Sequence, residues 1–293
     1  MKEKPLVSII VPTQNSSRTI DICLESIREQ TYPNIEIIVI DNYSIDGTVE
    51  TARKYGSIVF QVRALRSAAR NYGAKKAGGT FLVFIDADQE LTPEVIEECV
   101  QKAINDHADA IMIPEIRSGE GFWGKCRALE RLTYIGDPLI ESARFYRKEV
   151  FERVGEYDER LEAGEDRDLH AQVEDTGCRI VSIKAIMKHH EEHMMLKDLV
   201  RKRYHYGKTF MRYVRKHPER ARVQFIPLRL NFLRNWRILA KQPLYACGMF
   251  LMKLVEYMAT VIALSSSRKA LFGQTDYNTS CTHYSLRIAH ASE

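Results

Sequence analysis

The chain has 293 residues, 45% of them hydrophobic and 28% charged, with no long low-complexity segment and no internal repeat. A chain of this length can form one domain with a sizeable core and an appendage. The six cysteines are scattered and include no C-x-x-C pair, which speaks against a zinc site and a disulfide framework. A reducing compartment is the simplest interpretation. The apolar run from Leu6 to Pro12 is too short for a signal-peptide core with a cleavage site, so we expect a cytoplasmic protein.

The net charge of +4 conceals an asymmetry along the chain. Residues 1–185 carry 24 Lys or Arg and 32 Asp or Glu, a net charge of −8. Residues 186–293 carry 19 and 7, a net charge of +12. A basic C-terminal third joined to an acidic body indicates an anionic partner, such as phospholipid, a lipid phosphate or nucleic acid.

Apolar, β-branched runs alternate with helical patterns in the first part of the chain. We expect strands at residues 7–12, 35–40, 57–62, 81–85 and 110–114. We expect helices at residues 16–30, 48–55 and 67–77, and one more that Thr92-Pro93-Glu94 opens. This alternation predicts βαβ units, and therefore an α/β fold with a mainly parallel sheet flanked by helices.

Such sheets bind ligands beyond the carboxyl ends of their strands. Three polar segments follow apolar strands directly, at Pro12 to Asn15, Asp41 to Asp46 and Asp86 to Glu90. The sequence therefore predicts a binding site where these segments meet.

The pattern changes near residue 185. Lys197 to Lys216 has helical spacing and interleaves Arg and Lys with Tyr and Phe. Leu244 to Leu264 is apolar except for Lys253, Glu256 and small polar residues. We therefore expect an α/β domain at residues 1–190, a basic amphipathic helical region at 191–270 and a polar tail at 271–293.

Asp86 and Asp88 are two carboxylates separated by one small residue, directly after a predicted buried strand. This spacing suits a hard divalent cation, since Mg²⁺ or Mn²⁺ prefers oxygen ligands and completes its shell with substrate phosphates. Glu90 and His190 are candidate additional ligands. The alternatives are a solvated acidic turn for the two aspartates and a solvated surface position for the histidine.

Asp41 follows the second strand, where a carboxylate can accept hydrogen bonds from a nucleobase or a ribose hydroxyl; a turn role is the alternative. Arg66, Arg70 and Asn71 lie at the start of the helix that leads to the Asp86 strand. Arginine pairs bidentately with a diphosphate, and we favour Arg66 over Arg70 for this role. A solvated helix face is the alternative.

Glu165 and Asp166 follow Gly164 and open a helical stretch. An acid at this place can remove a proton from an acceptor hydroxyl. The alternative is structural, because acids favour a helix N-terminus through the helix dipole.

In their order along the chain, these motifs resemble those of family-2 inverting glycosyltransferases of the GT-A fold, over roughly residues 5–190. Val7 to Asn15 is similar to the opening strand and nucleotide loop of that family, and Val39 to Thr48 to its second element. Asn42 stands where the family often has a second acid. Arg66, Ala69, Asn71 and Gly73 match the segment before the D-x-D motif, and the segments from Gly155 to Asp158 and from Glu165 to Leu169 match its acceptor side.

The resemblance implies a GT-A (Rossmann-like) fold and metal-dependent, inverting transfer of a sugar from a nucleoside-diphosphate sugar to an acceptor. It implies that Asp86 and Asp88 hold Mg²⁺ or Mn²⁺ and that Asp166, with Glu165, supplies the catalytic base. The implied nucleotide-sugar site comprises Pro12, Thr13, Asn15, Asp41, Arg66, Asn71 and Asp86.

The basic C-terminal third favours a membrane-borne acceptor, such as a polyprenyl phosphate or a lipid-linked glycan. Leu244 to Leu264 is long enough to span a bilayer, but Lys253 and Glu256 are costly in hydrocarbon. They lie three residues apart on one helical face, where they can pair. We therefore expect a helix in the membrane surface and a protein peripheral on the cytoplasmic face. Packing on the α/β domain or on a dimer partner is the alternative.

Two other classes of function stay open. A nucleotidyltransferase-like enzyme also uses paired aspartates and a metal, but its glycine-rich basic nucleotide loop is missing at Thr13 to Ser17. A non-catalytic module that binds anionic lipid or nucleic acid would leave the polar strand ends without a purpose. We expect no nucleic-acid partner.

Overall fold

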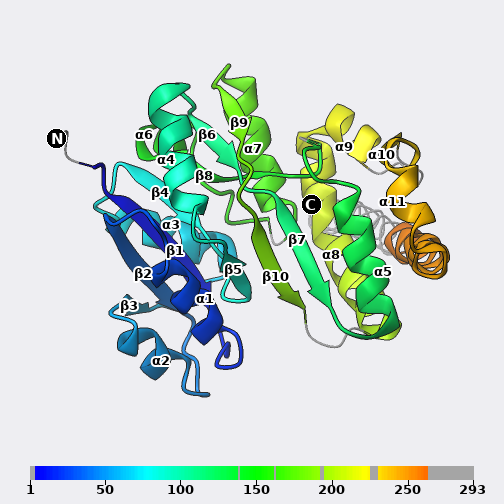
Figure 1. Ribbon diagram of the computed structural model, residues 1–293, viewed down its shortest axis with the longest axis horizontal. Helices are drawn as coiled ribbons and strands as arrows, with labels where there is room; N and C mark the ends of the chain where they lie inside the picture. Colours follow the sequence, from blue (N-terminus) through cyan, green and yellow to red (C-terminus); the bar gives the residue numbers. More distant parts are fainter. Residues whose placement is uncertain (1–3, 138, 162, 192–194, 225–229, 263–293) are drawn as a thin grey trace, which may run out of the picture.

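The computed structural model describes residues 4–137, 139–161, 163–191, 195–224 and 230–262. Its centre is a seven-stranded sheet with the order β3-β2-β1-β4-β8-β6-β9 (Figure 1). Only β8 runs antiparallel to its neighbours β4 and β6, so the sheet is mixed and mainly parallel. Its strands are β1 (Val7–Thr13), β2 (Ile35–Asp41), β3 (Ile58–Gln61), β4 (Phe81–Phe84), β6 (Ala110–Met112), β8 (Ala143–Arg147) and β9 (Ile180–Ser182).

Helices cover both faces of this sheet. One face carries α1 (Ile20–Arg28), α2 (Thr48–Lys54) and α4 (Val95–Asn105). The other face carries α3 (Arg66–Lys76), α6 (Lys148–Arg153) and α7 (Glu165–Asp175). The predicted α/β class, with a mainly parallel sheet flanked by helices and a C-terminal helical region, is confirmed.

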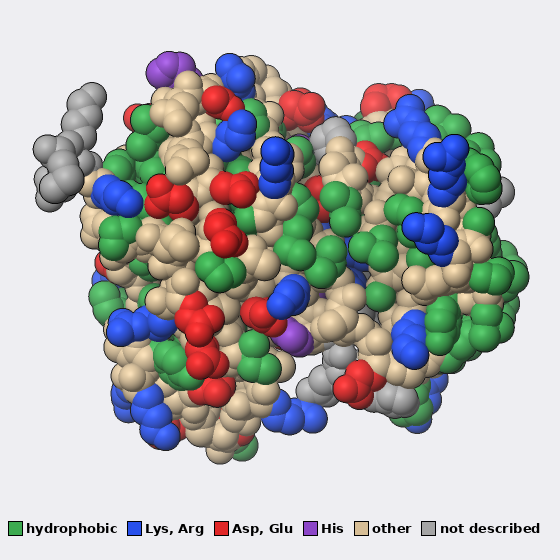
Figure 2. Space-filling model, viewed as in Figure 1, with side chains coloured by type: hydrophobic (Ala, Val, Ile, Leu, Met, Phe, Trp, Pro, Cys, Tyr) green, Lys and Arg blue, Asp and Glu red, His purple; other side chains and the backbone are tan. Residues whose placement is uncertain are grey.

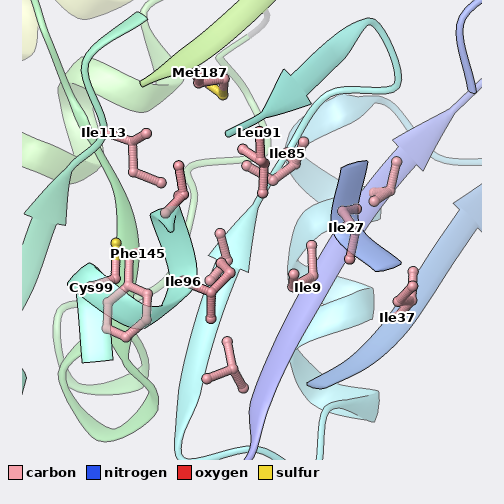
Figure 3. Packing of buried hydrophobic residues seen from close by; sticks show 14 of the residues in the cluster. Ile9, Ile27, Ile37, Ile85, Leu91, Ile96, Cys99, Ile113, Phe145 and Met187 are labelled. Atoms are coloured by element: carbon pink, nitrogen blue, oxygen red, sulfur yellow. The ribbon is translucent and has the colours of Figure 1, made fainter. Parts of the chain in front are cut away.

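The strands alternate their side chains between two cores. In β1, Ile9 faces the core under α1 and α4, whereas Ile10 faces the core under α3. Figure 3 shows the first of these cores, where Ile9 lies between Ile27 of α1 and Ile96 of α4. Burial on both faces explains why these strands are apolar throughout. On the second face, a Cβ atom at Gly73 would lie 2.5 Å from Cγ2 of Ile10, so only glycine lets α3 approach β1 this closely.

A second sheet joins the α/β body to the C-terminal part of the chain. It has the order β5-β10-β7, with β5 at Gln89–Leu91, β7 at Glu115–Gly119 and β10 at Met187–Glu191. β10 pairs antiparallel with β5, which directly follows Asp88, and parallel with β7. The start of β5 therefore lies next to the carboxyl end of β4, where the aspartate motif stands.

The C-terminal helices gather at the end of the molecule opposite β3 (Figure 1). They pack on α5 (Gly121–Leu132) around a core that includes Leu129, Phe232, Met249 and Met252. These helices are α8 (Leu196–Lys216), α9 (Pro218–Gln224), α10 (Leu230–Arg234), α11 (Trp236–Ala240) and a last helix at Pro243–Ile262.

Among the contacts that join this region to the α/β body, one involves a buried acid of α7. Asp168 of α7 is fully buried and accepts hydrogen bonds from Lys216 Nζ at 2.8 Å and His217 Nε2 at 2.7 Å. The end of α8 therefore neutralises a carboxylate two residues beyond Asp166. The domain boundary at residue 190 stays a prediction, and the polar tail at 271–293 lies outside the described residues.

The structure corrects two expectations about the elements. The first helix begins at Ile20 rather than Ser16, because backbone N–H groups of Ser16 and Ser17 bind side chains of Thr48 and Asp46 and keep these residues in a loop. Further, the segment from Glu115 to Leu132, left unassigned in the sequence, forms a strand and a helix.

Candidate active site

The three predicted polar segments lie together at the carboxyl edge of the sheet. Thr13 at the end of β1 pairs in register with Asp41 at the end of β2. The next strand on the other side of β1 is β4, and the backbone N–H of Ile85 donates to the carbonyl of Ile10. Asp86 therefore emerges beside the end of β1, as expected for parallel strands.

The loops after β1 and β2 bind each other. The backbone N–H of Asn15 donates to Ser44 Oγ at 2.8 Å, and Asn15 Oδ1 accepts the N–H of Ile45 at 3.0 Å. Asn15 has a positive φ of 48°, a left-handed conformation that asparagine tolerates better than most residues. This clamp gives the predicted nucleotide loop a defined shape.

Asp41 is fully buried and hydrogen-bonded within this pair of loops. It accepts the N–H of Ser44 at 3.0 Å, the Ser44 hydroxyl, and Gln61 Nε2 at 3.1 Å. Thr13 is buried beside it, and its hydroxyl has no hydrogen-bond partner among the described residues. A buried hydroxyl without a protein partner can bind a ligand, which fits the predicted nucleotide role of Thr13.

The Asp86-Ala87-Asp88 motif forms a tight turn. The backbone N–H of Gln89 donates to the carbonyl of Asp86, and Gln89 Oε1 accepts the N–H of Asp86 at 2.8 Å. Gln89 is buried, so these two hydrogen bonds between Asp86 and Gln89 hold the turn on its buried side. The side chains of Asp86 and Asp88 are thus held at the end of β4, where the sequence predicted them.

Two arginines, one fully buried and one with 12% of its side chain exposed, join this motif to the predicted catalytic acid. Arg70 of α3 donates to Asp86 Oδ1 and to Asp166 Oδ1, both at 2.7 Å. Arg144 of β8 lies 3.5 Å from Asp86 and 3.4 Å from Asp166. Asp86 and Asp166 are 80 positions apart in the sequence, yet they share both guanidinium groups.

The charges in this cluster set the protonation of its acids. Burial opposes ionisation of Asp166, but Arg144 and Arg70 outweigh burial and lower its pKa below the ordinary value. For Asp86 too, Arg70 and Arg144 outweigh burial and hold the pKa far below its usual range. Burial and the neighbouring Asp166 instead raise the pKa of Glu165. Two adjacent acids whose pKa values separate in this way suit different roles, and Asp166 is the one that stays ionised.

Asp88 is the more accessible carboxylate of the motif, with 42% of its side chain exposed, against 19% for Asp86. One of its oxygens lies 3.1 Å from His189 Nε2. Among the described residues, no three His, Cys, Asp or Glu side chains group as a metal site. An exposed carboxylate next to a second one nevertheless fits Mg²⁺ or Mn²⁺, because these ions are often held by one or two carboxylates together with substrate phosphates.

The weaker predicted ligands are engaged elsewhere. Glu90 Oε2 lies 2.7 Å from His190 Nε2, and Glu90 Oε1 accepts from Lys188 Nζ at 2.7 Å. Together they form a cross-strand cluster between β5 and β10. The structure thus gives Glu90 and His190 a role in pairing these strands.

Three further residues of the predicted nucleotide-sugar site, Pro12, Arg66 and Asn71, differ in how exposed they are and in what they contact. Pro12 lies within β1, opposite Ile40, and is only partly buried. Arg66 has 49% of its side chain exposed and lies 3.4 Å from Glu165, at the same edge of the sheet as the acid cluster. Asn71 is buried, donates to the carbonyl of Tyr157 and to Glu159, and accepts the N–H of Tyr157. Both the nitrogen and the oxygen of its side-chain amide therefore bind protein groups, which indicates a structural role for Asn71 rather than contact with a nucleotide.

Sequence reasoning underrated one of these arginines and missed the other. It ranked Arg70 below Arg66, although Arg70 has no exposed surface and holds both aspartates. Arg144 was not considered, because its strand was not recognised. The available signal was a charged residue within Ala143-Arg144-Phe145-Tyr146, a run otherwise apolar enough for a buried strand.

Comparisons with known proteins identify the family and the fold. The family described as "Glycosyl transferase family 2" matches residues 8–155. The glycosyltransferase EpsH of Bacillus subtilis is 34% identical over 116 residues, which cover 38% of this chain and 33% of that protein. The chain spans a third to about half of the length of the first curated relatives that it matches.

Two solved structures share the fold. The mannosyltransferase PcManGT of Pyrobaculum calidifontis, in complex with GDP-Man and Mn²⁺, has a TM-score of 0.66 at 18% identity and aligns over 90% of this chain and 88% of its own. The S. aureus protein TarS, in complex with UDP-GlcNAc, has a TM-score of 0.55 at 17% identity over 90% of this chain and 92% of its own.

Proposed function

The chain belongs to glycosyl transferase family 2, and from this premise we propose that it is a metal-dependent, inverting transferase of a sugar from a nucleoside-diphosphate sugar. Donors of this type occur in both solved structures named above, one with GDP-Man and one with UDP-GlcNAc. The family match favours the transferase over the nucleotidyltransferase-like and non-catalytic alternatives.

One observation carries the proposal: the donor-side acid Asp86 and the acceptor-side acid Asp166 share Arg70 at 2.7 Å each. A displacement at the anomeric carbon needs the leaving diphosphate on one side of the sugar and the acceptor with its base on the other. The cluster keeps the two acids in one rigid arrangement, since a buried guanidinium holds both at hydrogen-bond distance.

In the proposed reaction the acceptor oxygen forms a bond to the anomeric carbon while the bond from that carbon to the diphosphate breaks. The acceptor proton passes to the carboxylate of Asp166, and the nucleoside diphosphate leaves. Asp166 is available to accept this proton because Arg144 and Arg70 outweigh burial and keep the carboxylate ionised. For an acceptor that is already an anionic phosphate, Asp166 would instead orient the acceptor.

Asp88, with Asp86, would hold Mg²⁺ or Mn²⁺, which when bound neutralises the charge of the leaving diphosphate. The Mn²⁺ in the PcManGT complex supports divalent metal use in this fold. The protein itself positions Asp88 through the Gln89 turn and His189, and presents Arg66 at the same edge.

We propose further that the acceptor is lipid-linked and that the protein is peripheral on the cytoplasmic membrane face. The support is the charge of +12 on residues 186–293 beside an acidic body. An anionic membrane surface would concentrate a protein with this asymmetry.

Thermal shift with a panel of UDP- and GDP-sugars tests the proposal, in Mn²⁺ and in chelator. A bound donor at a hundredfold excess over its dissociation constant should raise the melting temperature by about 5 °C or more. Asp88→Asn should abolish the metal-dependent part of the shift without changing the melting temperature of the free protein, because the side chain is partly exposed. Asp106→Asn, an acid on the far end of α4, is the control. No shift with any donor in metal would refute the donor assignment, and a shift that chelator leaves intact would refute the metal assignment.

A further inference from the structure

The last helix exposes an apolar face that nothing in the described chain covers. Pro243–Ile262 has 20 residues and a mean hydropathy of 1.3, which meets the length and composition of a membrane span, but only a third of it is buried. Large apolar side chains recur on one side at spacings of three and four residues. The exposed members are Leu244, Phe250, Leu251, Leu254, Tyr257, Met258, Val261 and Ile262.

The opposite side of this helix is fastened to α5. A Cβ atom at Gly248 would lie 2.6 Å from Phe122 and from Cys126, so the two helices are in close contact. Met249 and Met252 have no exposed surface. One side of this helix is therefore part of a protein core, and the opposite side is exposed.

Its two charged residues lie on the fastened side. Lys253 Nζ lies 2.8 Å from Glu130 and 2.9 Å from Glu256, which confirms the predicted pairing of Lys253 with Glu256. Arg127 in turn lies 2.8 Å from both Glu130 and Glu256. A transmembrane orientation would break these ion pairs and move Lys253 and Glu256 into the hydrocarbon of the bilayer. Both changes cost free energy. If this helix contacts a membrane, its axis must therefore lie parallel to the membrane plane, and the helix does not span the bilayer.

The surface next to the apolar face is positively charged. Trp236, 58% exposed, and Leu233, 71% exposed, extend the apolar face onto α10 and α11. Arg234, Arg237 and Lys241 are exposed between them. Glu256 is the one acid in residues 230–262, and it is buried, so every exposed charge of this segment is positive. Figure 2 shows hydrophobic side chains with Lys and Arg beside them on the edge of the molecule that these elements form.

We propose that this face, from Leu233 to Ile262, lies in the surface of a membrane that contains anionic phospholipid. The apolar side chains enter the region between headgroups and acyl chains, Trp236 sits at the interface, and the three cations face lipid phosphates. The occupant is a lipid surface rather than a second copy of the chain, because a copy would bring its own three cations against these. The inference deepens the proposed membrane-borne acceptor, but it is independent of catalysis.

The test uses the full chain with Trp123→Phe, which leaves Trp236 as the only tryptophan. The protein is sedimented with vesicles of phosphatidylcholine alone or mixed with phosphatidylglycerol. We expect it to pellet with the anionic vesicles and the Trp236 emission to shift to shorter wavelength. The triple variant Leu251→Gln, Leu254→Gln, Met258→Gln should bind at least tenfold more weakly, since each side chain loses its apolar burial. Replacing Arg234, Arg237 and Lys241 by Gln should weaken binding to anionic vesicles about fivefold per charge.

The matched control replaces three exposed isoleucines of the α/β body, Ile22, Ile58 and Ile104, by Gln and should bind as the unmodified chain does. All variants are checked by circular dichroism and by the donor-induced thermal shift, which should persist and so separates this inference from the proposed function. Folded protein that stays in the supernatant with anionic vesicles overturns the proposal. So does a dimer in light scattering that the Leu251, Leu254, Met258 variant dissociates while vesicle binding is absent, because the face would then bind a second copy.

Discussion

At the scale of single residues, the site is a cluster of five ionisable side chains rather than a pair of motifs. Arg70 and Arg144 are each shared between Asp86 and Asp166, and Glu165 joins through Arg70. The two largely buried arginines would be costly if unpaired, and the acids would not stay ionised without them. The donor and acceptor sides of the site are therefore electrostatically one unit.

Asp166→Asn tests the base. We expect kcat to fall by about 10²- to 10⁴-fold, the usual contribution of a general base, while the donor-induced thermal shift persists. Asp175→Asn at the exposed end of the same helix is the control and should keep full activity. A near-normal kcat in the Asp166 variant, with an acceptor that carries a hydroxyl, would show that this residue is not the base.

Arg144→Met tests the cluster. Loss of this cation leaves Asp86 and Asp166 with Arg70 alone, and removing one partner of a buried charge pair costs about 3–5 kcal/mol. The pKa of Asp166 should rise, since Arg144 is the strongest cation acting on it, and the acid limb of the pH–kcat profile should move to higher pH. Urea unfolding and the pH profile measure the two effects.

Arg147→Met is the matched control, because Arg147 lies on the same strand and faces Asp109 at 3.8 Å, away from the acid cluster. It should leave the acid limb in place. An unshifted acid limb in the Arg144 variant would contradict the coupling between Arg144 and Asp166.

The sequence made the three acids of this cluster predictable. Asp86 and Glu165-Asp166 follow a buried strand and a glycine, which are local signals. Arg144 has no local signal of function, because what it does depends on two acids 58 and 22 positions away that only the fold brings together. The partners in such an ion pair are far apart in the sequence. Each of them, seen locally, is only a charged residue that interrupts an apolar run.

At the scale of elements, the difference between local and long-range signals also explains which strands can be predicted from the sequence and which cannot. β1, β2 and β4 are buried on both faces, so nearly every residue is apolar and the run is easily recognised. β7 and β8 carry charged residues inward: Glu115 of β7 is buried and lies near Arg131 and His189. Such strands break the alternation that sequence patterns depend on.

The junction of α7 and β8 predicts a pH dependence of stability. Nδ1 of His170 accepts the backbone N–H of Ala143 at 3.2 Å, which requires a neutral ring. Burial lowers the pKa of His170 below its ordinary value of about 6.5. As the pH falls through 6.5, the unfolded chain therefore binds this proton before the folded protein does. The His170 contribution to stability is present above about pH 6.5 and is lost as the pH falls toward the folded pKa.

Urea unfolding between about pH 7.5 and 5.5 should accordingly show a decrease in the free energy of unfolding toward acid. His170→Asn keeps an acceptor for Ala143 and does not titrate, so its slope should be shallower. His107→Asn, at an exposed histidine, should retain the slope of the unmodified chain. Equal slopes in the His170 variant and the unmodified chain would rule out this histidine as the cause.

At the scale of the whole molecule, the C-terminal helices are docked to the α/β body through charges as well as apolar contacts. Glu130 of α5 is buried and receives Arg127, Lys253 and the Tyr134 hydroxyl. Lys253 and Arg127 outweigh burial and hold the pKa of Glu130 well below its ordinary value, so the carboxylate stays ionised. This network decides how firmly the last helix is held.

Glu130→Gln should therefore loosen the last helix before the α/β body unfolds, because Arg127 and Lys253, both mostly buried, lose one of their carboxylate partners. Limited proteolysis followed by mass spectrometry should show faster cleavage within residues 230–262 and an unchanged rate within residues 7–84. Glu219→Gln, an exposed acid paired with Arg222, is the control. Unchanged cleavage in the Glu130 variant would mean that the apolar contacts alone hold the helix.

The bond from Lys216 and His217 to Asp168 also limits how freely parts of this protein can be exchanged. A chimaera that joined residues 1–190 to the C-terminal region of a relative would leave a fully buried carboxylate unneutralised two positions from Asp166. The foreign segment would have to bring a cation to the same spot, or the helix bearing the acid would shift. Residues 1–190 grafted alone would therefore lack Lys216 and His217, the residues that hydrogen-bond Asp168 beside the acid cluster.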